Sequence, residues 1–290
     1  MLLRVLRARL LSARDSFEVT PKNFAIMNDR NPKPEIPEST WMGIRCATDI
    51  IRGSKHGVVL SGAGISTPSG IPDFRSPDTG LWSKFDPMEV ASLAAFRYDP
   101  QKFYQGLRGL TELVFTARPN AAHLALARLE QAGYIQTVIT QNVDLLHQRA
   151  GSKNVLEVHG SFQTLTCVWC FTKVGSESYI NPYLEQGLVP TCPRCGHYLK
   201  PDLVLFGEQL PSKTWLQALN ASKNCDLMIV AGSSLEVLPV AGLPMRALEN
   251  GAHLILINYS QTYLDVRADV VFHEDVDHIL PYLVDHLLEN

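Results

Sequence analysis

The sequence predicts an α/β protein with a doubly wound parallel sheet, into which a smaller module is inserted. Two observations support this fold class. Two C-x-x-C pairs interrupt the chain between 167 and 195. Elsewhere, short apolar runs of strand length alternate with segments whose apolar residues follow helical spacing. The strand-like runs lie at 58–60, 134–140, 155–158, 226–231 and 253–257.

Four helices are predicted from capping residues and apolar spacing. The first is expected to start after a cap at Ser39 or Thr40 and to end near Gly53. A second starts at Asp99-Pro100, where a capping side chain precedes a proline in the first turn. The others cover about 119–133 and the C-terminal stretch from about 277.

The composition is that of a globular protein large enough for one big domain and a smaller one. The chain has 290 residues, of which 46% are hydrophobic and 19% are charged. It contains no run of about 18 uncharged apolar residues, so we expect no membrane span. The net charge of −3 argues against broad nucleic-acid binding. Because four of the six cysteines form C-x-x-C pairs, metal binding in a reducing compartment is favoured over disulfides.

Residues 1–38 differ from the rest, and we expect a flexible N-terminal extension and linker there. The first 14 residues contain four arginines and no acid, with leucines that could share one helical face. Such a segment can be an amphipathic presequence for the mitochondrial matrix. The alternatives are a disordered basic tail or a true start at Met27, and with either of them we expect a cytoplasmic protein.

The stretch 57–75, GVVLSGAGISTPSGIPDFR, joins a buried strand to a glycine-rich turn. In Gly62-Ala63-Gly64 the missing side chains let backbone N–H groups approach a ligand. A strand that turns through glycines into a helix N-terminus can bind phosphate, because unpaired N–H groups and the helix dipole point outward. Thr67 replaces the third glycine of the dinucleotide fingerprint, so a plain strand-to-helix turn is the alternative. Residues 73–75 place an acid, an aromatic ring and a guanidinium beside the expected phosphates.

Polar residues follow four further strand-like runs, and ligands gather at such strand ends in open α/β sheets. Gln141-Asn142-Val143-Asp144 could bind ribose hydroxyls and a carboxamide, or form a polar turn. His159, before Gly160, has a side chain whose ordinary pKa suits a general base. The turns Gly232-Ser233-Ser234 and Asn258-Tyr259-Ser260 suit phosphate or ribose. His147, on the helix after the first of these segments, is expected at the surface.

The two cysteine pairs, Cys167-x-x-Cys170 and Cys192-x-x-Cys195, predict one metal site. Each pair can form a knuckle whose two thiolates meet the same ion. Four sulfur ligands leave no position for water, which fits one structural Zn²⁺ ion rather than a catalytic one. An iron–sulfur cluster is the alternative. The segment between the pairs is short and rich in turn formers, so the metal is expected to hold this module together.

In their order along the chain, these motifs resemble the signatures of the sirtuin family, the NAD-dependent protein lysine deacylases, in its bacterial-type deacetylase subgroup. The resemblance covers about residues 40–290. It rests on GAGIS, SGIPDFR, TQNVD, the His159-Gly160 pair, both C-x-x-C pairs, FGE, GSS and the last Asn-containing turn. It implies a Rossmann-like NAD-binding domain at 39–165 and 198–290, with a helical insertion at about 77–118. The zinc-binding module is then expected at 166–197.

The resemblance also implies roles for individual residues. The catalytic residues would be His159, Asn142 and Asp144, with the last two holding the nicotinamide carboxamide. NAD would contact Gly62, Ala63, Gly64, Thr67, Asp73, Phe74, Arg75, Gln141, Asn142, Val143, Asp144, His159, Gly232, Ser233, Ser234, Asn258, Tyr259 and Val276. The acyl-lysine and its peptide, which would add as a strand, are implied to contact Val204, Phe206, Gly207, Glu208, Glu236 and Val237.

The implied reaction is deacetylation without hydride transfer. The acyl oxygen would attack the ribose carbon of NAD as nicotinamide departs, and His159 would then act as general base on a ribose hydroxyl. Water would complete the release of lysine and O-acyl-ADP-ribose. Family members that prefer succinyl or malonyl groups carry a Tyr-x-x-Arg pair. Here Tyr104 is followed by Leu107 at that spacing, with Arg108 one residue too far, so acetyl-lysine is the expected substrate.

Several other functions stay open at this point. They are a desuccinylase or other deacylase, a protein mono-ADP-ribosyltransferase, a non-catalytic NAD-sensing scaffold and a hydride-transfer dehydrogenase. A scaffold would need no base such as His159. A dehydrogenase is disfavoured by the missing third glycine and by the lack of an acid about 20 residues further on. The expected partners are acetylated lysine side chains of proteins or peptides, with no specific nucleic acid and no membrane, and we expect a monomer.

Overall fold

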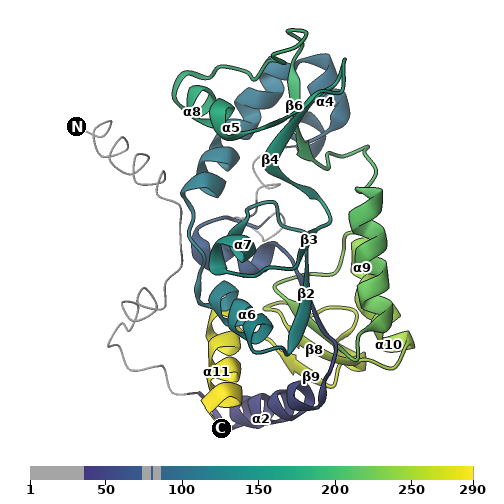
Figure 1. The fold of residues 1–290 in the computed structure, drawn as a ribbon. Coiled ribbons are helices and arrows are strands. Elements are labelled where there is room, and N and C mark those ends of the chain that lie inside the picture. The colour runs from purple at the N-terminus through teal and green to yellow at the C-terminus, as the bar shows by residue number, and fades with distance from the viewer. Residues whose placement is uncertain (1–35, 74–79, 81–85, 290) are drawn as a thin grey trace, which may run out of the picture. The chain divides into compact units, whose positions relative to one another are not determined.

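The computed structural model describes residues 36–73, 80 and 86–289 of the chain (Figure 1). The chain divides into a unit at Met1–Ile36, almost wholly outside the described residues, and a compact body at Pro37–Asn290. Residues 1–35 of the expected N-terminal extension and two expected cofactor contacts, Phe74 and Arg75, also lie outside the described residues. Within the described part of the chain, no helix is both long enough and apolar enough to span a membrane.

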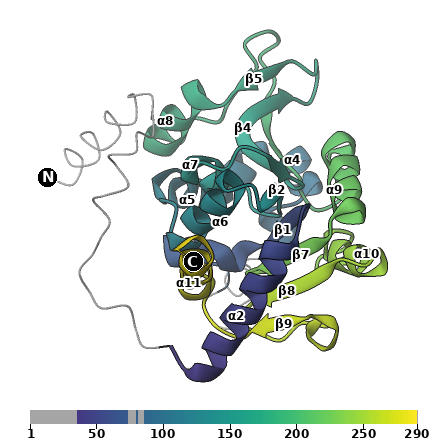
Figure 2. The same cartoon turned by 60° about the horizontal axis from the view of Figure 1, so that its bottom comes forward.

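A six-stranded parallel sheet forms the centre of the larger lobe, in the order β3-β2-β1-β7-β8-β9; Figure 2 labels all of these strands except β3. Its strands are β1 (Gly57–Ser61), β2 (Ile135–Thr140), β3 (Val155–Glu157), β7 (Leu227–Ala231), β8 (His253–Ile257) and β9 (Val270–Phe272). Counted along the chain, this is the order 3-2-1-4-5-6 of a doubly wound nucleotide-binding sheet. The predicted fold class is confirmed, and the strand order reverses between β1 and β7.

Helices cover both faces of this sheet, which is why β1 and β7 are buried along their whole length. The helices α2 (Glu38–Gly53), α6 (Ala121–Gln131) and α11 (Val276–Glu289) pack together on one face. The opposite face carries α9 (Ser212–Asn224) and α10 (Leu243–Glu249), as Figure 2 shows. Alternate residues of β1, Val58 and Leu60, join the apolar cluster under α9 and α10.

Side-chain caps decide where several helices begin. Asp99 caps α5 (Pro100–Thr116) as predicted, because its carboxylate accepts from the Lys102 N–H at 3.0 Å. The helix expected from 119 begins instead at Ala121, because the Asn120 side chain accepts from the backbone N–H groups of Ala122 and His123. The expected cap of α2 at Ser39 or Thr40 is wrong. That helix starts at Glu38, and Thr40 donates its hydroxyl to Glu274 Oε1 at 2.8 Å.

A smaller lobe is built on a three-stranded antiparallel sheet in the order β5-β4-β6. The strands are β4 (Gly160–Cys167), β5 (Lys173–Gly175) and β6 (Leu199–Leu203), and α8 (Glu177–Gln186) follows β5. The sequence placed the zinc module at 166–197. The small sheet beside the metal site extends beyond these bounds, because β4 and β6 pair with each other away from the cysteines.

The helical insertion ties this lobe to the edge of the large sheet. It contains α3 (Pro87–Val90), α4 (Leu93–Tyr98) and α5. Phe96 and Phe103 of these helices share an apolar cluster with Leu205 and with Leu146 of α7 (Leu146–Ala150). Since α7 directly follows the polar segment at 141–144, packing in the smaller lobe fixes the chain at a predicted functional site.

Candidate active site

Two glycine-containing loops cross where the strand order reverses. The Gly64 N–H donates to the carbonyl of Gly232 at 2.9 Å. Side chains would not fit here, because a Cβ on Gly62 or Gly64 would lie 2.8 or 2.9 Å from the Gly232 oxygen. Gly232 itself has a φ of +61°, a conformation that other residues rarely adopt. The turn after β1 therefore lies directly against the turn after β7.

The turn after β1 enters two short 3-10 helices, at Ala63–Ile65 and Thr67–Ser69. The sequence led us to expect the N-terminus of a full helix here, with its dipole behind a phosphate, and this expectation is wrong. The physical reason is Pro68 in the second short helix and the left-handed Gly70 that ends it. Ligand phosphates would therefore be bound by local N–H groups, including that of Ala63, rather than by a long helix dipole.

A buried cluster of polar side chains lies against this turn. The Asn142 amide nitrogen donates to the carbonyl of Gly62 and to Ser66 Oγ, both at 3.0 Å. Ser66 Oγ donates in turn to Asp144 Oδ2 at 2.6 Å. All three side chains are buried. The structure thus joins Asn142 and Asp144, two residues predicted as catalytic, through a serine of the β1 turn.

Asp144 is a carboxyl group held on both oxygens. Its Oδ1 accepts from the Leu146 N–H at 2.9 Å, while Oδ2 accepts from Ser66. Burial raises the pKa of Asp144, and these hydrogen bonds together with the Arg149 charge partly oppose the rise. The side chain is therefore fixed in position between the β1 turn and the start of α7.

His159 follows β3 and is oriented by the segment that carries the polar cluster. Its Nδ1 lies 3.0 Å from the backbone carbonyl of Gln141, which can only accept, so Nδ1 carries the hydrogen. Burial lowers the pKa of His159, and the contact with Gln141 opposes this in part. The ring is therefore neutral near pH 7, with its lone pair on Nε2. A neutral imidazole with an oriented lone pair is what a general base requires.

Most of the residues predicted for the rest of the nucleotide lie in the turns that follow β1, β2, β7 and β8. Gln141 Nε2 donates to Ser233 Oγ at 3.0 Å, which links the ends of β2 and β7. Asn258 follows β8, and its side chain donates to the carbonyl of Ser260 at 2.7 Å. Gly62, Gly232, Ser233, Asn258 and Val276 are buried; Ala63, Gly64, Asp73, Val143 and Ser234 are partly buried; Thr67 and Tyr259 are exposed.

The residues predicted for acyl-lysine lie in two surface segments. The first, Val204 to Glu208, begins with a hydrogen bond from the Val204 N–H to the His159 carbonyl at 2.8 Å. At the other end of this segment, Lys200 Nζ forms an ion pair with Glu208 Oε2 at 2.9 Å. Within these segments Phe206, Gly207 and Glu236 are exposed, and Val204, Glu208 and Val237 are partly buried. The first segment is therefore linked to the predicted base by a backbone hydrogen bond.

The four paired cysteines lie together at one end of the small sheet. Their sulfur atoms are all within 4.8 Å of one another, and none of them is in a disulfide. Sγ of Cys195 lies 3.5 Å from that of Cys167 and 3.4 Å from that of Cys170. A zinc ion with Zn–S bonds of about 2.3 Å holds its sulfur ligands about 3.8 Å apart. The arrangement therefore fits a closed tetrahedral Zn²⁺ site of the structural type.

Three residues near the polar cluster were not identified as functional from the sequence. Ser66 closes the GAGIS motif, and that motif is the signal that could have identified it. His147, expected at the surface, is 1% exposed and lies 2.8 Å from Ser61 Oγ, so that expectation is wrong. Glu157, at the end of β3, is a carboxyl group whose pKa burial raises to about 7. No sequence pattern marked the last two, because their burial depends on how helices pack on the sheet.

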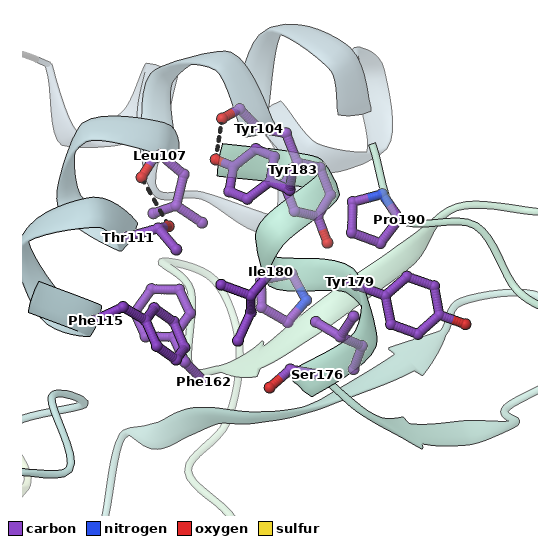
Figure 3. A pocket seen from close by; sticks show the side chains of 12 residues that line it. Tyr104, Leu107, Thr111, Phe115, Phe162, Ser176, Tyr179, Ile180, Tyr183 and Pro190 are labelled. Atoms are coloured by element: carbon purple, nitrogen blue, oxygen red, sulfur yellow. Dashed lines mark hydrogen bonds between the residues drawn. The ribbon is translucent and has the colours of Figure 1, made fainter. Parts of the chain in front are cut away.

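The smaller lobe contains a small cavity, and none of the residues that line it was predicted to bind NAD, acyl-lysine or zinc (Figure 3). It lies between α5, α8 and the small sheet, and its volume is about 20 Å³. Its lining is largely aromatic and aliphatic, including Phe115, Phe162 and Ile180. Such a volume holds one water molecule at most and is too small for a nucleotide or an acyl chain. We therefore assign the cavity to imperfect packing of the lobe.

A doubly wound sheet with glycine loops in contact at the point where the strand order reverses is typical of nucleotide-binding proteins. The neutral, oriented His159 nearby has the properties of a general base, which indicates an enzyme. The chain belongs to the Sir2 family, whose model matches residues 62–239. The NAD-dependent protein deacylase 2 of Archaeoglobus fulgidus is 44% identical over 245 residues, covering 84% of this chain and 96% of the relative.

Solved structures of Sir2 enzymes share the fold. One, from work on the mechanism and regulation of these enzymes, has a TM-score of 0.80 at 44% identity, covering 86% of this chain and 98% of that chain. Another holds a deacetylated p53 peptide and 3′-O-acetyl ADP-ribose, with a TM-score of 0.78 at 39% identity, covering 84% and 97%. The resemblance inferred from the motifs is confirmed.

The loop crossing predicts a large effect of one added methyl group. In Gly232→Ala, the new Cβ would lie 2.5 Å from the Gly64 carbonyl carbon, so the two loops must separate. We expect NAD affinity, measured by calorimetry, to fall about tenfold or more. Gly251→Ala is the matched control, because it also has positive φ but no neighbour within 4 Å of its Cβ. Equal losses of NAD affinity in both variants would contradict the placement of the NAD site at the contact between the turns after β1 and β7.

The metal site predicts a structural role for zinc. Cys192→Ser removes one thiolate, so we expect loss of bound zinc and faster hydrogen exchange in β4, β5 and β6. Zinc content by elemental analysis and exchange by mass spectrometry measure these effects. Cys225→Ser is the control, since Cys225 is buried outside the metal set and its variant should keep one zinc per chain. If Cys192→Ser retained its zinc, the assignment of Cys192 as a zinc ligand would be wrong.

Glu157 predicts a pH-dependent loss of stability. Burial raises its pKa from 4.5 to about 7, whereas hydrogen bonds from Gln148 and Ser161 act in the other direction. The folded state thus binds the proton of Glu157 more tightly than the unfolded state does. The stabilisation that comes from protonated Glu157 is therefore complete below pH 4.5 and is lost as pH rises through 7. Relative to Glu157→Gln, we expect the free energy of unfolding to fall by about 2 kcal/mol between about pH 5 and pH 8. Denaturant titrations at each pH measure it, and parallel profiles would show that Glu157 is ionised throughout.

Proposed function

We propose that this chain is an NAD-dependent protein lysine deacetylase that transfers the acetyl group of acetyl-lysine to ADP-ribose and releases nicotinamide. The observation that carries the proposal is the neutral His159, oriented through Nδ1 beside the buried Asn142–Ser66–Asp144 cluster. The archaeal relative named a deacylase and the Sir2 structure with acetyl ADP-ribose support the same reaction.

Bound NAD would supply an activated ribose carbon with nicotinamide as its leaving group. The chain would contribute the surroundings of that carbon. Asn142 and Asp144 are rigid because their hydrogen bonds to Ser66, Gly62 and Leu146 leave them no alternative rotamers without losing buried partners. A rigid amide and carboxyl suit recognition of a carboxamide, and their burial excludes water from the leaving group.

His159 would act at its Nε2 atom. Because Nδ1 donates to the Gln141 carbonyl, Nε2 keeps the lone pair that accepts a proton from a ribose hydroxyl. Burial lowers the pKa of His159, so the neutral, basic form dominates at pH 7. The Gln141 carbonyl would then stabilise the imidazolium that forms, since its contact with Nδ1 favours the charged ring.

The surroundings of Tyr104 support a preference for acetyl groups. The Tyr104 hydroxyl donates to the carbonyl of Leu199 at 2.7 Å, and Leu107 is a buried apolar side chain. Arg108 Nε donates to the carbonyl of Leu184 at 3.1 Å, within the small lobe. Leu107 stands at the position where Tyr-x-x-Arg spacing would place the arginine, so no charge is available there for a succinyl carboxylate and the uncharged acetyl group is favoured.

The test is turnover of acetylated and succinylated forms of one peptide with NAD, followed by mass spectrometry of the products. We expect deacetylated peptide, nicotinamide and O-acetyl-ADP-ribose, with little turnover of the succinylated form. His159→Ala should lower kcat about 10²- to 10⁴-fold while zinc content and the unfolding temperature persist. His253→Ala, at the exposed start of β8, is the control and should retain activity. Undiminished turnover in His159→Ala would refute the assigned base.

A further inference from the structure

A chain of buried hydrogen bonds runs behind the Asn142–Ser66–Asp144 cluster. It starts at His147 on α7, whose Nε2 lies 2.8 Å from Ser61 Oγ at the end of β1. Ser61 Oγ donates to Thr140 Oγ1, at the end of β2, at 2.9 Å. Thr140 Oγ1 also accepts from the Asn142 backbone N–H at 3.1 Å. His147, Ser61 and Thr140 are 1%, 0% and 2% exposed, so no water competes for these bonds.

The direction of the first bond follows from the others. A hydroxyl has one hydrogen, which Ser61 directs at Thr140, and a hydrogen on His147 Nδ1 would have no acceptor, so the imidazole donates from Nε2 to Ser61. Burial lowers the pKa of His147 to about 4, which keeps the ring neutral with Nδ1 as an acceptor. Thr140 then receives hydrogens from both Ser61 and Asn142.

A second buried histidine, His123, is linked through Asn120 to the turn after β1. His123 Nδ1 donates to Asn120 Oδ1 at 3.0 Å, and the same amide donates from Nδ2 to the Ile65 carbonyl at 2.8 Å. The rings of His123 and His147 pack edge to face, with centroids 4.9 Å apart. The two histidines thus connect α6 and α7 to the turn after β1 and to the end of β2.

Packing alone does not account for an imidazole at position 147. The His147 Nδ1 and His123 Nε2 atoms are buried and have no hydrogen-bond partner in the structure. An unpaired buried acceptor destabilises a fold, whereas a phenylalanine ring would fill the same space without that cost. What an imidazole supplies and an apolar ring does not is the Nε2–H that Ser61 accepts.

We propose that His147 is a positioning residue for the nicotinamide pocket. Its Nε2–H holds the Ser61 hydroxyl so that Ser61 points its hydrogen at Thr140, and Thr140 then fixes the backbone at Asn142. The Asn142 side chain, and Asp144 two residues later, depend on that backbone for their position. The inference rests on the proposed function only in naming the ligand of the pocket as nicotinamide.

The first test compares two substitutions of His147 by binding, so that it does not depend on turnover. The glutamine of His147→Gln would keep an amide N–H near the position of Nε2, whereas the phenylalanine of His147→Phe would keep only the ring volume. We expect His147→Phe to weaken NAD binding about tenfold in calorimetry and to leave ADP-ribose binding, which lacks nicotinamide, unchanged. His147→Gln should bind both nearly as the unsubstituted chain does. Equal loss for both ligands, or no loss, would overturn the proposal.

The second test breaks the same chain of bonds at its middle and remains available if His147→Phe does not fold. We expect Ser61→Ala to reproduce the selective loss of NAD binding, and the double variant to be no worse than either single one, because both remove one pathway. Ser222→Ala is the control: it is also fully buried, but on α9, and should leave both affinities unchanged. Additive losses would show that His147 and Ser61 act separately and would overturn the proposal.

Turnover separates this proposal from the proposed function. If the unsubstituted chain deacetylates the peptide, His147→Phe should lower kcat with little change in KM for the peptide, and His147→Gln should restore it. A rise in the peptide KM in both variants would indicate a general loss of structure and would overturn the positioning role. If the unsubstituted chain lacks deacetylase activity, the proposed function fails, yet the contrast between NAD and ADP-ribose still decides the role of His147.

Discussion

The hydrogen bond from the Gly64 N–H to the Gly232 carbonyl is the contact on which the rest of the site depends. It brings the turn after β1 against the turn after β7, at the place where the strand order reverses. The neighbouring contacts start from this crossing, since Asn142 donates to the Gly62 carbonyl and Gln141 to Ser233. A single added Cβ would separate the loops, and Gly232 also has a positive φ, so glycine is required here both by packing and by backbone conformation.

The chemistry of the site follows from burial combined with selected hydrogen bonds. Burial by itself lowers the pKa of His159 and raises that of Asp144, which disfavours charge at both groups. The hydrogen bonds then decide geometry: the carbonyl of Gln141 selects the tautomer of His159, and Ser66 orients Asp144. The smaller lobe contributes by packing, because Leu146 anchors α7 in its apolar cluster and so fixes the chain after Asp144.

Much of the fold could be read from local patterns. Apolar runs located five of the six strands of the large sheet, all except β9. The Asp99-Pro100 pair located the start of α5, and the spacing of the C-x-x-C pairs located a metal site whose sulfurs do lie together. These patterns succeed because they depend on neighbours in the chain. The start of α2 was missed because Thr40 donates to Glu274 rather than capping the helix. The full helix expected after β1 was missed because Pro68 and the left-handed Gly70 limit that segment to short 3-10 helices.

The amino-acid order was sufficient to establish the parallel sheet, the four-cysteine site and the family, because strand periodicity, ligand spacing and motif order are properties of the linear chain. Only the packed molecule revealed that Ser66 joins Asn142 to Asp144 and that His147 lies buried against Ser61. His147 lies 86 residues from Ser61 in the chain, and no local rule reports a contact over that separation. Which nitrogen of His159 holds the lone pair was likewise settled by a carbonyl 18 residues away, which folding alone brings within hydrogen-bond distance.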